Sequence, residues 1–132
     1  MLRGHCQCGQ VRYEADAPPI QETACHCSIC RRSSGAPLVA WFTVPRASFR
    51  FTQGTPSRFQ SSAHGTRSFC PGCGTQLTFE SSRLPEEIDI STCSLDDPER
   101  VPPRDHTHVA SRLSWVQLAD GLRAYPGARA DG

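Results

Sequence analysis

The chain has 132 residues, which is long enough for one domain that buries its own core without disulfide bridges. Its 14 Lys and Arg residues balance 13 Asp and Glu residues to a net charge of +1, so its charge does not favour nucleic acid as a partner. No stretch approaches the ~20 apolar residues of a membrane span, and the first ten residues lack a secretory signal, so we expect a soluble cytoplasmic protein with no membrane partner.

The first half of the chain reads as short strands around one helical segment. Apolar residues alternate with polar ones over 11–15 and again over 49–51, which is the pattern of half-buried strands. The stretch 37–44, PLVAWFTV, is a continuous apolar run of strand length. Residues 28–34, SICRRSS, show no alternation and precede Gly35, a residue typical of helix C-termini, so we predict a short helix there.

The second half repeats the strand pattern and ends less clearly. Alternation over 77–79 and 88–90 predicts two more strands, and clusters of Pro, Gly and Asp separate the segments. The stretch 114–122 fits either a second short helix or a final strand, and 125–132 reads as a frayed tail. These elements predict a small, mainly β fold of antiparallel sheets with at most one or two short helices.

Cysteines are the most informative residues of the chain, because a reducing cytoplasm favours metal ligation over disulfides for a patterned set of thiols. Seven of the eight fall into three groups, and these are Cys6 with Cys8, Cys25 with Cys27 and Cys30, and Cys70 with Cys73. Cys93 stands alone in the strand-like IDISTCSL, so we expect it to be a small buried apolar residue.

Two of the groups can complete one metal site. Cys70 and Cys73 lie in FCPGCG, a C-x-x-C turn of the kind found in zinc knuckles, whose backbone amides can point at sulfur. In HCQCG, Cys6 and Cys8 would face the same side of an extended strand. Together the four thiolates match the closed tetrahedral coordination of a structural zinc ion.

The group at 25–30, CHCSIC, is then left with three ligands and an open fourth position, which is the stoichiometry of a catalytic zinc. An alternative joins Cys27 and Cys30 to the C-x-x-C turn as a ribbon-type site and leaves Cys6, Cys8 and Cys25 over. Spacing alone does not exclude that alternative.

Histidines near these groups have weaker interpretations. His26 alternates with two candidate ligands, so we expect it to point away from the metal, toward the surface or beside the site. His106 and His108 could face one side of a strand and assist chemistry or a metal, although an exposed polar role is the more common one for histidine.

The motifs taken together resemble one family. The segments GHCQCGQVRY, CHCSICRRSSG, FCPGCGTQL, SLDDP and HTHVASRLSWVQLADGL resemble the glutathione-dependent formaldehyde-activating enzyme family, whose domain also occurs in centromere protein V. The resemblance implies a single zinc-binding domain at 4–125, followed by a C-terminal tail at 126–132. Two positions depart from the pattern and could alter a substrate pocket, namely His108 and Ser114.

The resemblance also implies a β-tent fold, made of small antiparallel sheets that meet over zinc, and two zinc ions per chain. Its structural zinc would be held by Cys6, Cys8, Cys70 and Cys73, and its second, catalytic zinc by Cys25, Cys27 and Cys30.

The activity implied is that of a carbon–sulfur lyase, similar to S-hydroxymethylglutathione synthase, which joins glutathione or a related thiol to formaldehyde or another small carbonyl compound. Three thiolates leave a zinc site with a charge of −1, which suits holding and ionising an incoming thiol, whose pKa is otherwise roughly 8.5. Arg31 and Arg32 are the nearest candidates to bind the carboxylates of glutathione, but a solvated helix end is the favoured interpretation of this pair. His26 and His106 are candidate general acids.

Two other classes of function compete with this one. In a non-catalytic binding module both zinc ions would be structural, and a fourth protein ligand such as His26 or Cys93 would close the second site. In a thiol redox protein CSIC would cycle as a dithiol pair without zinc.

Overall fold

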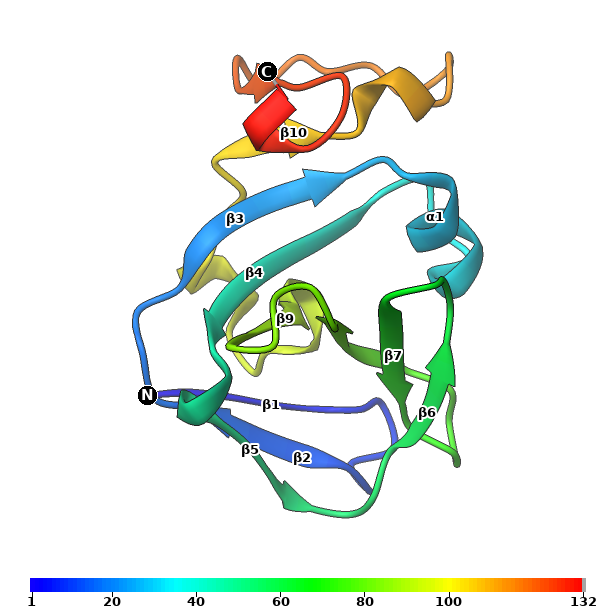
Figure 1. Cartoon of the computed structure of the whole chain (residues 1–132). Coiled ribbons are helices and arrows are strands. Elements are labelled where there is room, and N and C mark those ends of the chain that lie inside the picture. Colours follow the sequence, from blue (N-terminus) through cyan, green and yellow to red (C-terminus); the bar gives the residue numbers. More distant parts are fainter. Residues whose placement is uncertain (132) are drawn as a thin grey trace.

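The computed structural model describes residues 1–131 and consists mainly of β-strands (Figure 1). Over these residues it contains a three-stranded sheet, an eight-stranded sheet and one α-helix. The small sheet has the order β1 (Leu2–His5), β2 (Arg12–Ala15), β5 (Phe49–Gln53) and lies at the bottom of Figure 1. The mainly β prediction is confirmed.

The large sheet runs through the middle and top of Figure 1, from β6 and β7 to the C-terminal segment. In spatial order its strands are β11 (Arg123–Ala124), β10 (Asp105–Thr107), β3 (Ile20–Cys25), β4 (Val39–Pro45), β9 (Glu87–Ser91), β8 (Gln76–Ser81), β7 (Gly65–Phe69) and β6 (Ser57–Gln60). The helix is α1 (Ser28–Ser34), and short 3₁₀ turns occupy Arg46–Ser48, Thr92–Ser94, Pro98–Arg100, Val109–Ser111 and Arg129–Asp131.

The prediction of purely antiparallel sheets is wrong at one edge. β10 pairs in parallel with β3 on one side and with β11 on the other, whereas the other pairs of both sheets are antiparallel across the described residues. The reason is the long connection after β9, which carries the chain back so that β10 runs beside β3 in the same direction.

The two sheets enclose the main core. Central strand β4 is buried on both faces, because Phe42 and Val44 point into this core while Trp41 and Thr43 lie on the opposite face. This explains the continuous apolar run of the sequence. In β9 Ile88 and Ile90 also point into the core, so Asp89 between them lies on the opposite face of the sheet. The buried members of the core are Leu2, Cys6, Val11, Tyr13, Ala15, Phe42, Val44, Phe49, Cys70, Leu77, Ile88, Ile90, Leu95 and Val101.

Helix α1 occupies the predicted range, 28–34. The Cys27 sulfur caps its first turn by accepting a hydrogen bond from the Cys30 amide at 3.3 Å. Gly35 ends the helix with φ of 65°, a left-handed conformation that glycine adopts at little cost, and its amide donates to the Arg31 carbonyl. Because the cap is a cysteine, the start of the helix is tied to the second cysteine group.

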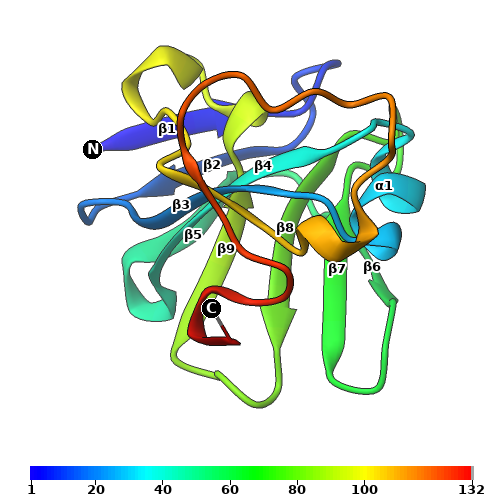
Figure 2. The ribbon, with the colours of Figure 1, turned by 90° about the horizontal axis from the view of Figure 1, so that it is seen from above.

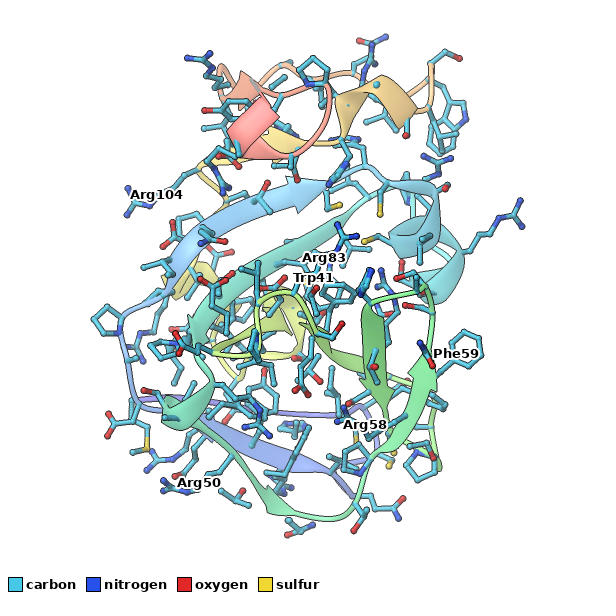
Figure 3. All side chains as sticks on the ribbon, in the orientation of Figure 1. Trp41, Arg50, Arg58, Phe59, Arg83 and Arg104 are labelled. Carbon is cyan, nitrogen blue, oxygen red and sulfur yellow. The ribbon has the colours of Figure 1, made fainter. Side chains whose placement is uncertain are left out.

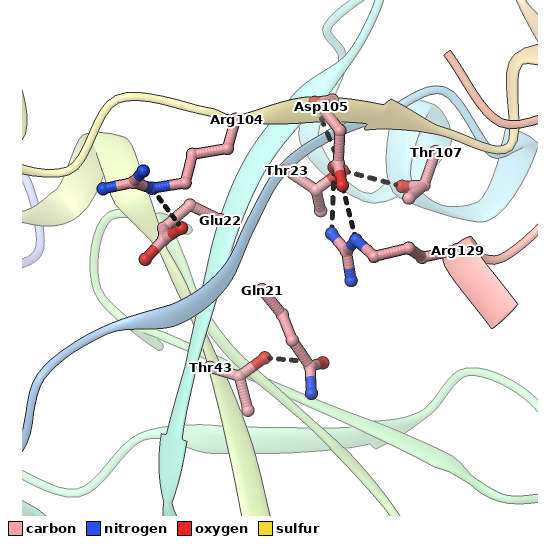
Figure 4. Close-up of polar contacts among 8 residues, drawn as sticks. All are labelled: Gln21, Glu22, Thr23, Thr43, Arg104, Asp105, Thr107 and Arg129. Atoms are coloured by element: carbon pink, nitrogen blue, oxygen red, sulfur yellow. Dashed lines mark hydrogen bonds and ion pairs between the residues drawn. The ribbon is translucent and has the colours of Figure 1, made fainter. Parts of the chain in front are cut away.

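The C-terminal segment was predicted incorrectly in two respects. Residues 114–122 form neither a helix nor a strand but a turn and irregular chain, and the short strand β11 follows at Arg123–Ala124. The segment 125–131 is not frayed, because it packs across β3 and β10 (Figure 2). The His108 amide donates to the Gly127 carbonyl at 2.8 Å, and Arg129 donates two hydrogen bonds to the Asp105 carboxylate (Figure 4).

Replacing Asp105 with asparagine is expected to destabilise the protein by about 1–2 kcal/mol at neutral pH, because Asp105 is buried and Arg129 is only about one-third exposed. Burial alone would raise the pKa of Asp105, but the hydrogen bonds and charge of Arg129 outweigh it and hold the pKa below its usual value. A lowered pKa gives stability above the unfolded pKa of roughly 4, and this is lost as the pH falls through the folded pKa.

Urea unfolding of wild type and Asp105→Asn between pH 7 and pH 3 checks this. The difference in unfolding free energy should be largest near pH 7 and should vanish at the acid end. Glu22→Gln is the matched control, because Glu22 pairs at 2.9 Å with an Arg104 side chain that is 78 % exposed (Figure 4). A loss for Glu22→Gln as large as for Asp105→Asn would contradict the prediction.

Candidate metal centres and the cavity beside them

The four cysteines that were predicted to hold the first metal ion bring their sulfurs close together. The sulfurs of Cys6, Cys8, Cys70 and Cys73 all lie within 4.8 Å of one another. The Cys6 and Cys8 sulfurs are 3.5 Å apart, and those of Cys8 and Cys70 are 3.7 Å apart. Four sulfurs at 2.3 Å from a tetrahedral zinc would stand about 3.8 Å from each other. The group therefore fits a zinc-sized ion, and the ribbon alternative is wrong because Cys70 and Cys73 do not join Cys27 and Cys30.

Each half of this group is a tight turn. In the C-x-x-C turn the amides of Gly72 and Cys73 donate to the Cys70 sulfur at 3.3 and 3.4 Å, as predicted for a zinc knuckle. The prediction that Cys6 and Cys8 share an extended strand is wrong. β1 ends before Cys6, and residues 6–9 form a turn closed by the Gly9 amide and the Cys6 carbonyl at 3.0 Å. Two similar turns thus each supply two sulfurs to the four-cysteine group.

The second group gathers three sulfurs and, over residues 1–131, no fourth protein ligand. Cys25 ends β3, Cys27 caps α1 and Cys30 lies in its first turn, and their sulfurs lie within 4.8 Å of one another. The Cys25 and Cys30 sulfurs are 3.6 Å apart, again close to the spacing around zinc. Hydrogen bonds from the Cys25 and Cys30 thiols lower the pKa of Cys27. Among the described residues, neither His26 nor Cys93 joins the group.

A cavity of about 340 Å³ opens directly beside this second group. All three of its cysteines line the cavity, so the fourth side of the cluster faces free volume. The other walls come from the outer face of the large sheet and from the C-terminal segment. They include Gln21, Trp41, Thr43, Arg67, Phe79, Asp89, Thr107, His108 and Arg129.

Arg67 is a cavity residue that the sequence analysis missed. It lies on β7 with only 6 % of its surface exposed, and its guanidinium donates to the Cys30 sulfur at 3.5 Å. The same group lies 5.0 Å from the Phe79 ring centroid and 5.9 Å from that of Trp41, which Figure 3 shows near the middle of the molecule. A buried positive charge therefore stands beside the thiols. Its only sequence signal is a position three residues before Cys70, which does not distinguish it from a surface arginine.

Asp89 is a second missed cavity residue. Burial raises its pKa to about 6, although a 2.6 Å hydrogen bond from the Thr43 hydroxyl opposes this shift. Its position between Ile88 and Ile90 placed it on the face away from the core, but nothing in the linear sequence connected it to the cysteines.

The histidines take separate roles. His26 is fully buried and its Nε2 contacts Nδ1 of His106 at 3.0 Å, so it points away from the cluster as predicted. His106 Nε2 in turn donates to the Asp120 carboxylate at 2.8 Å. His106 and His108 do not face the same side, because His108 has a left-handed backbone and lines the cavity while His106 does not.

Arg31 and Arg32 do not line the cavity. Arg31 donates to the carbonyls of His26 and Ser111 at 2.8 and 2.5 Å, so it fastens α1 to the C-terminal segment. The idea that this pair binds substrate carboxylates therefore finds no support.

Cys93 is exposed, and the prediction of a small buried residue is wrong. A 3₁₀ turn at Thr92–Ser94 interrupts the strand alternation, so Thr92 and Ser94 are buried and the cysteine between them turns outward. It lies in an open groove beside the four-cysteine group and contributes to neither cluster.

Comparison with known proteins agrees with this arrangement. The family model described as "Glutathione-dependent formaldehyde-activating enzyme" matches residues 1–111. The chain belongs to the glutathione-dependent formaldehyde-activating enzyme family. A family relative from Halomonas elongata, named "Putative glutathione-dependent formaldehyde-activating enzyme", is 30% identical over 127 residues, which cover 89% of this chain and 81% of the relative.

The fold recurs in a crystal structure of a Rhodobacter sphaeroides protein, which is 22% identical with a TM-score of 0.61 and covers 93% of this chain and 98% of that one. The family resemblance inferred from the motifs is thus confirmed. Within the described residues, no helix of this family member is long and apolar enough to cross a membrane.

Proposed function

We propose that the protein is a zinc-dependent carbon–sulfur lyase-type enzyme, similar to S-hydroxymethylglutathione synthase. It would form or cleave the bond between the sulfur of glutathione, or a related thiol, and the carbon of formaldehyde or another small carbonyl compound. The observation that carries this proposal is the cluster of Cys25, Cys27 and Cys30, which has no fourth protein ligand among the described residues and opens onto a cavity. Membership of the family supports the choice of thiol and carbonyl.

The donor sets support two zinc ions with different roles. Two tight turns supply the four cysteines that would hold a structural zinc, and two of the four are fully buried in the main core. The cluster at 25–30 would hold the second. A zinc ion bound there supplies a positive charge that lowers the pKa of an incoming thiol while leaving its sulfur nucleophilic. We further infer one β-tent domain in a cytoplasmic protein. It extends beyond the expected bounds of 4–125, because Leu2 lies in the core and Arg129 lines the cavity.

The chain's own residues would then orient the reactants. In the direction of synthesis the thiol loses its proton, the sulfur–carbon bond forms, and the carbonyl electron pair moves to oxygen, which takes up a proton. No oxidant is needed, so the dithiol redox alternative has no part in this step. Arg67 would stabilise the negative charge that develops on oxygen, and the rings of Trp41 and Phe79 would exclude water around it.

The test is zinc content per chain, with glutathione titrated into wild type and Cys27→Ser. We expect two zinc ions in wild type and one in the variant, and glutathione binding by the wild type alone. Cys93→Ser is the matched control and should behave as wild type, because Cys93 belongs to neither cluster. Two zinc ions with no thiol binding in wild type would instead support the non-catalytic binding module, and zinc-free protein would support the redox alternative.

A further inference from the structure

Asp89 is a carboxylate without a cation partner in the cavity beside Cys25, Cys27 and Cys30. Within the part of the chain that the structure describes, it forms no ion pair. Its carboxylate accepts a hydrogen bond from the Thr43 hydroxyl at 2.6 Å. By contrast, Glu14, Glu22, Glu80 and Asp105, whose side chains are at most 22 % exposed, are each paired with arginine.

Burying an unpaired carboxylate in this position destabilises the folded protein, and a bound cation would offset that free-energy cost. Burial raises the pKa of Asp89 to about 6, which still leaves the group mostly ionised at neutral pH. The charge of Glu87 acts unfavourably on the ionised Asp89 and that of Arg67 favourably, but Arg67 donates its own hydrogen bonds to Cys30, Ser61 and Gln76. The cavity therefore contains a desolvated negative charge at one side and the thiol cluster at another.

The sheet register gives the spacing between Asp89 and Arg67, whose guanidinium contacts the thiol cluster. Arg67 on β7 lies opposite Phe79 on β8, which lies opposite Asp89 on β9. Two strand spacings of about 4.8 Å thus separate the backbones of Arg67 and Asp89. Because the Arg67 guanidinium reaches the Cys30 sulfur, a ligand that spans the cavity would need a thiol at one end and a positive charge several bonds away. A γ-glutamyl thiol carries an ammonium group eight bonds from its sulfur, which is roughly 10 Å when extended.

We propose that Asp89 binds the ammonium group of the thiol substrate, so that the cavity selects γ-glutamyl thiols such as glutathione over thiols that lack this charge. The Thr43 hydroxyl positions the carboxylate. This inference rests on the proposed function, since it assumes that the thiol sulfur lies beside Cys25, Cys27 and Cys30.

Isothermal titration calorimetry of the zinc-loaded protein tests it with three ligands. Glutathione has both groups, N-acetylglutathione lacks the ammonium, and S-methylglutathione lacks the free thiol. In wild type we expect N-acetylglutathione to bind about tenfold more weakly than glutathione. Asp89→Asn should weaken glutathione by a similar factor and leave N-acetylglutathione nearly unchanged, because the two changes remove the same interaction.

Two further variants serve as the control and as a substitute for Asp89→Asn. Glu99→Gln, at an exposed carboxylate on the 3₁₀ turn Pro98–Arg100 and outside this cavity, should bind all three ligands as wild type does. If Asp89→Asn does not fold, Thr43→Val replaces it and should weaken glutathione more than N-acetylglutathione.

The outcomes separate the two proposals. Equal loss for glutathione and N-acetylglutathione in Asp89→Asn, or no loss for either, overturns the role of Asp89. A fall in kcat of the same size for both thiols, with binding unchanged, would make Asp89 a proton donor or acceptor instead and also overturns it. If the wild type binds S-methylglutathione as tightly as glutathione, the protein does not contact the free thiol. This result overturns the proposed function together with the inference.

Discussion

Replacing Cys70 with serine is expected to cost the protein about 4 kcal/mol or more, which is enough to unfold a domain of ordinary stability. Cys70 is fully buried in the main core and anchors the zinc knuckle through two amide hydrogen bonds to its sulfur. Serine is a poor zinc ligand and would leave a buried hydroxyl in place of a thiolate. Since metal binding at such a site is folding free energy, losing the ligand removes both the ion and the packing around it.

Thermal unfolding followed by circular dichroism, with zinc content measured on the same samples, checks this prediction. Cys70→Ser should be insoluble or should melt more than ~10 °C below wild type. Cys27→Ser is the informative comparison, because its group sits at the cavity and not in the main core. It should lose one zinc ion and retain most of the wild-type melting temperature. A Cys70→Ser protein as stable as wild type would show that the four-cysteine group is not structural.

The grouping of the cysteines could be predicted because it depends on counting and on short turns. A C-x-x-C turn encodes its own geometry in four residues, and the helix at 28–34 ends at the glycine that its sequence supplies. The presence of β2, β4, β5, β8 and β9 also followed from alternation or from an apolar run, since each apolar face is local. Counting allowed Cys6 and Cys8 to complete one site with Cys70 and Cys73 but left the ribbon alternative open, and only the family resemblance implied this pairing. The turn that presents the first pair was mistaken for a strand.

The walls of the cavity could not be predicted, because they depend on register between distant strands. Arg67, Phe79 and Asp89 become neighbours only through the pairing of β7, β8 and β9. Each is an ordinary residue in its own segment. The docking of Arg129 on Asp105 likewise joins residues far apart in the chain, so composition alone made the C-terminus look frayed.

Replacing Arg67 with methionine is expected to lower kcat/KM for the thiol and carbonyl substrates by about 100-fold or more. The guanidinium is the buried positive charge nearest the second cysteine group, with one nitrogen 3.5 Å from the Cys30 sulfur. Charge that builds up on the carbonyl oxygen would lose its nearest fixed donor in the cavity. Methionine fills a similar volume and keeps the contact with Phe79, so the fold should survive.

Steady-state kinetics of Arg67→Met and Arg67→Lys separates charge from shape. Lysine keeps the positive charge but lacks the planar guanidinium that contacts the rings of Trp41 and Phe79. The activity of Arg67→Lys should therefore lie between those of Arg67→Met and wild type. Arg58→Met is the control, because Arg58 lies on the neighbouring edge strand β6 with a half-exposed side chain that pairs with Glu80 (Figure 3). If Arg67→Met lowers only the melting temperature, and kcat/KM at a temperature where it is folded matches wild type, then Arg67 supports the sheet and not the reaction. If the loss falls on kcat with KM nearly constant, the guanidinium acts when charge develops on oxygen, which is the role that its place beside the thiol cluster predicts.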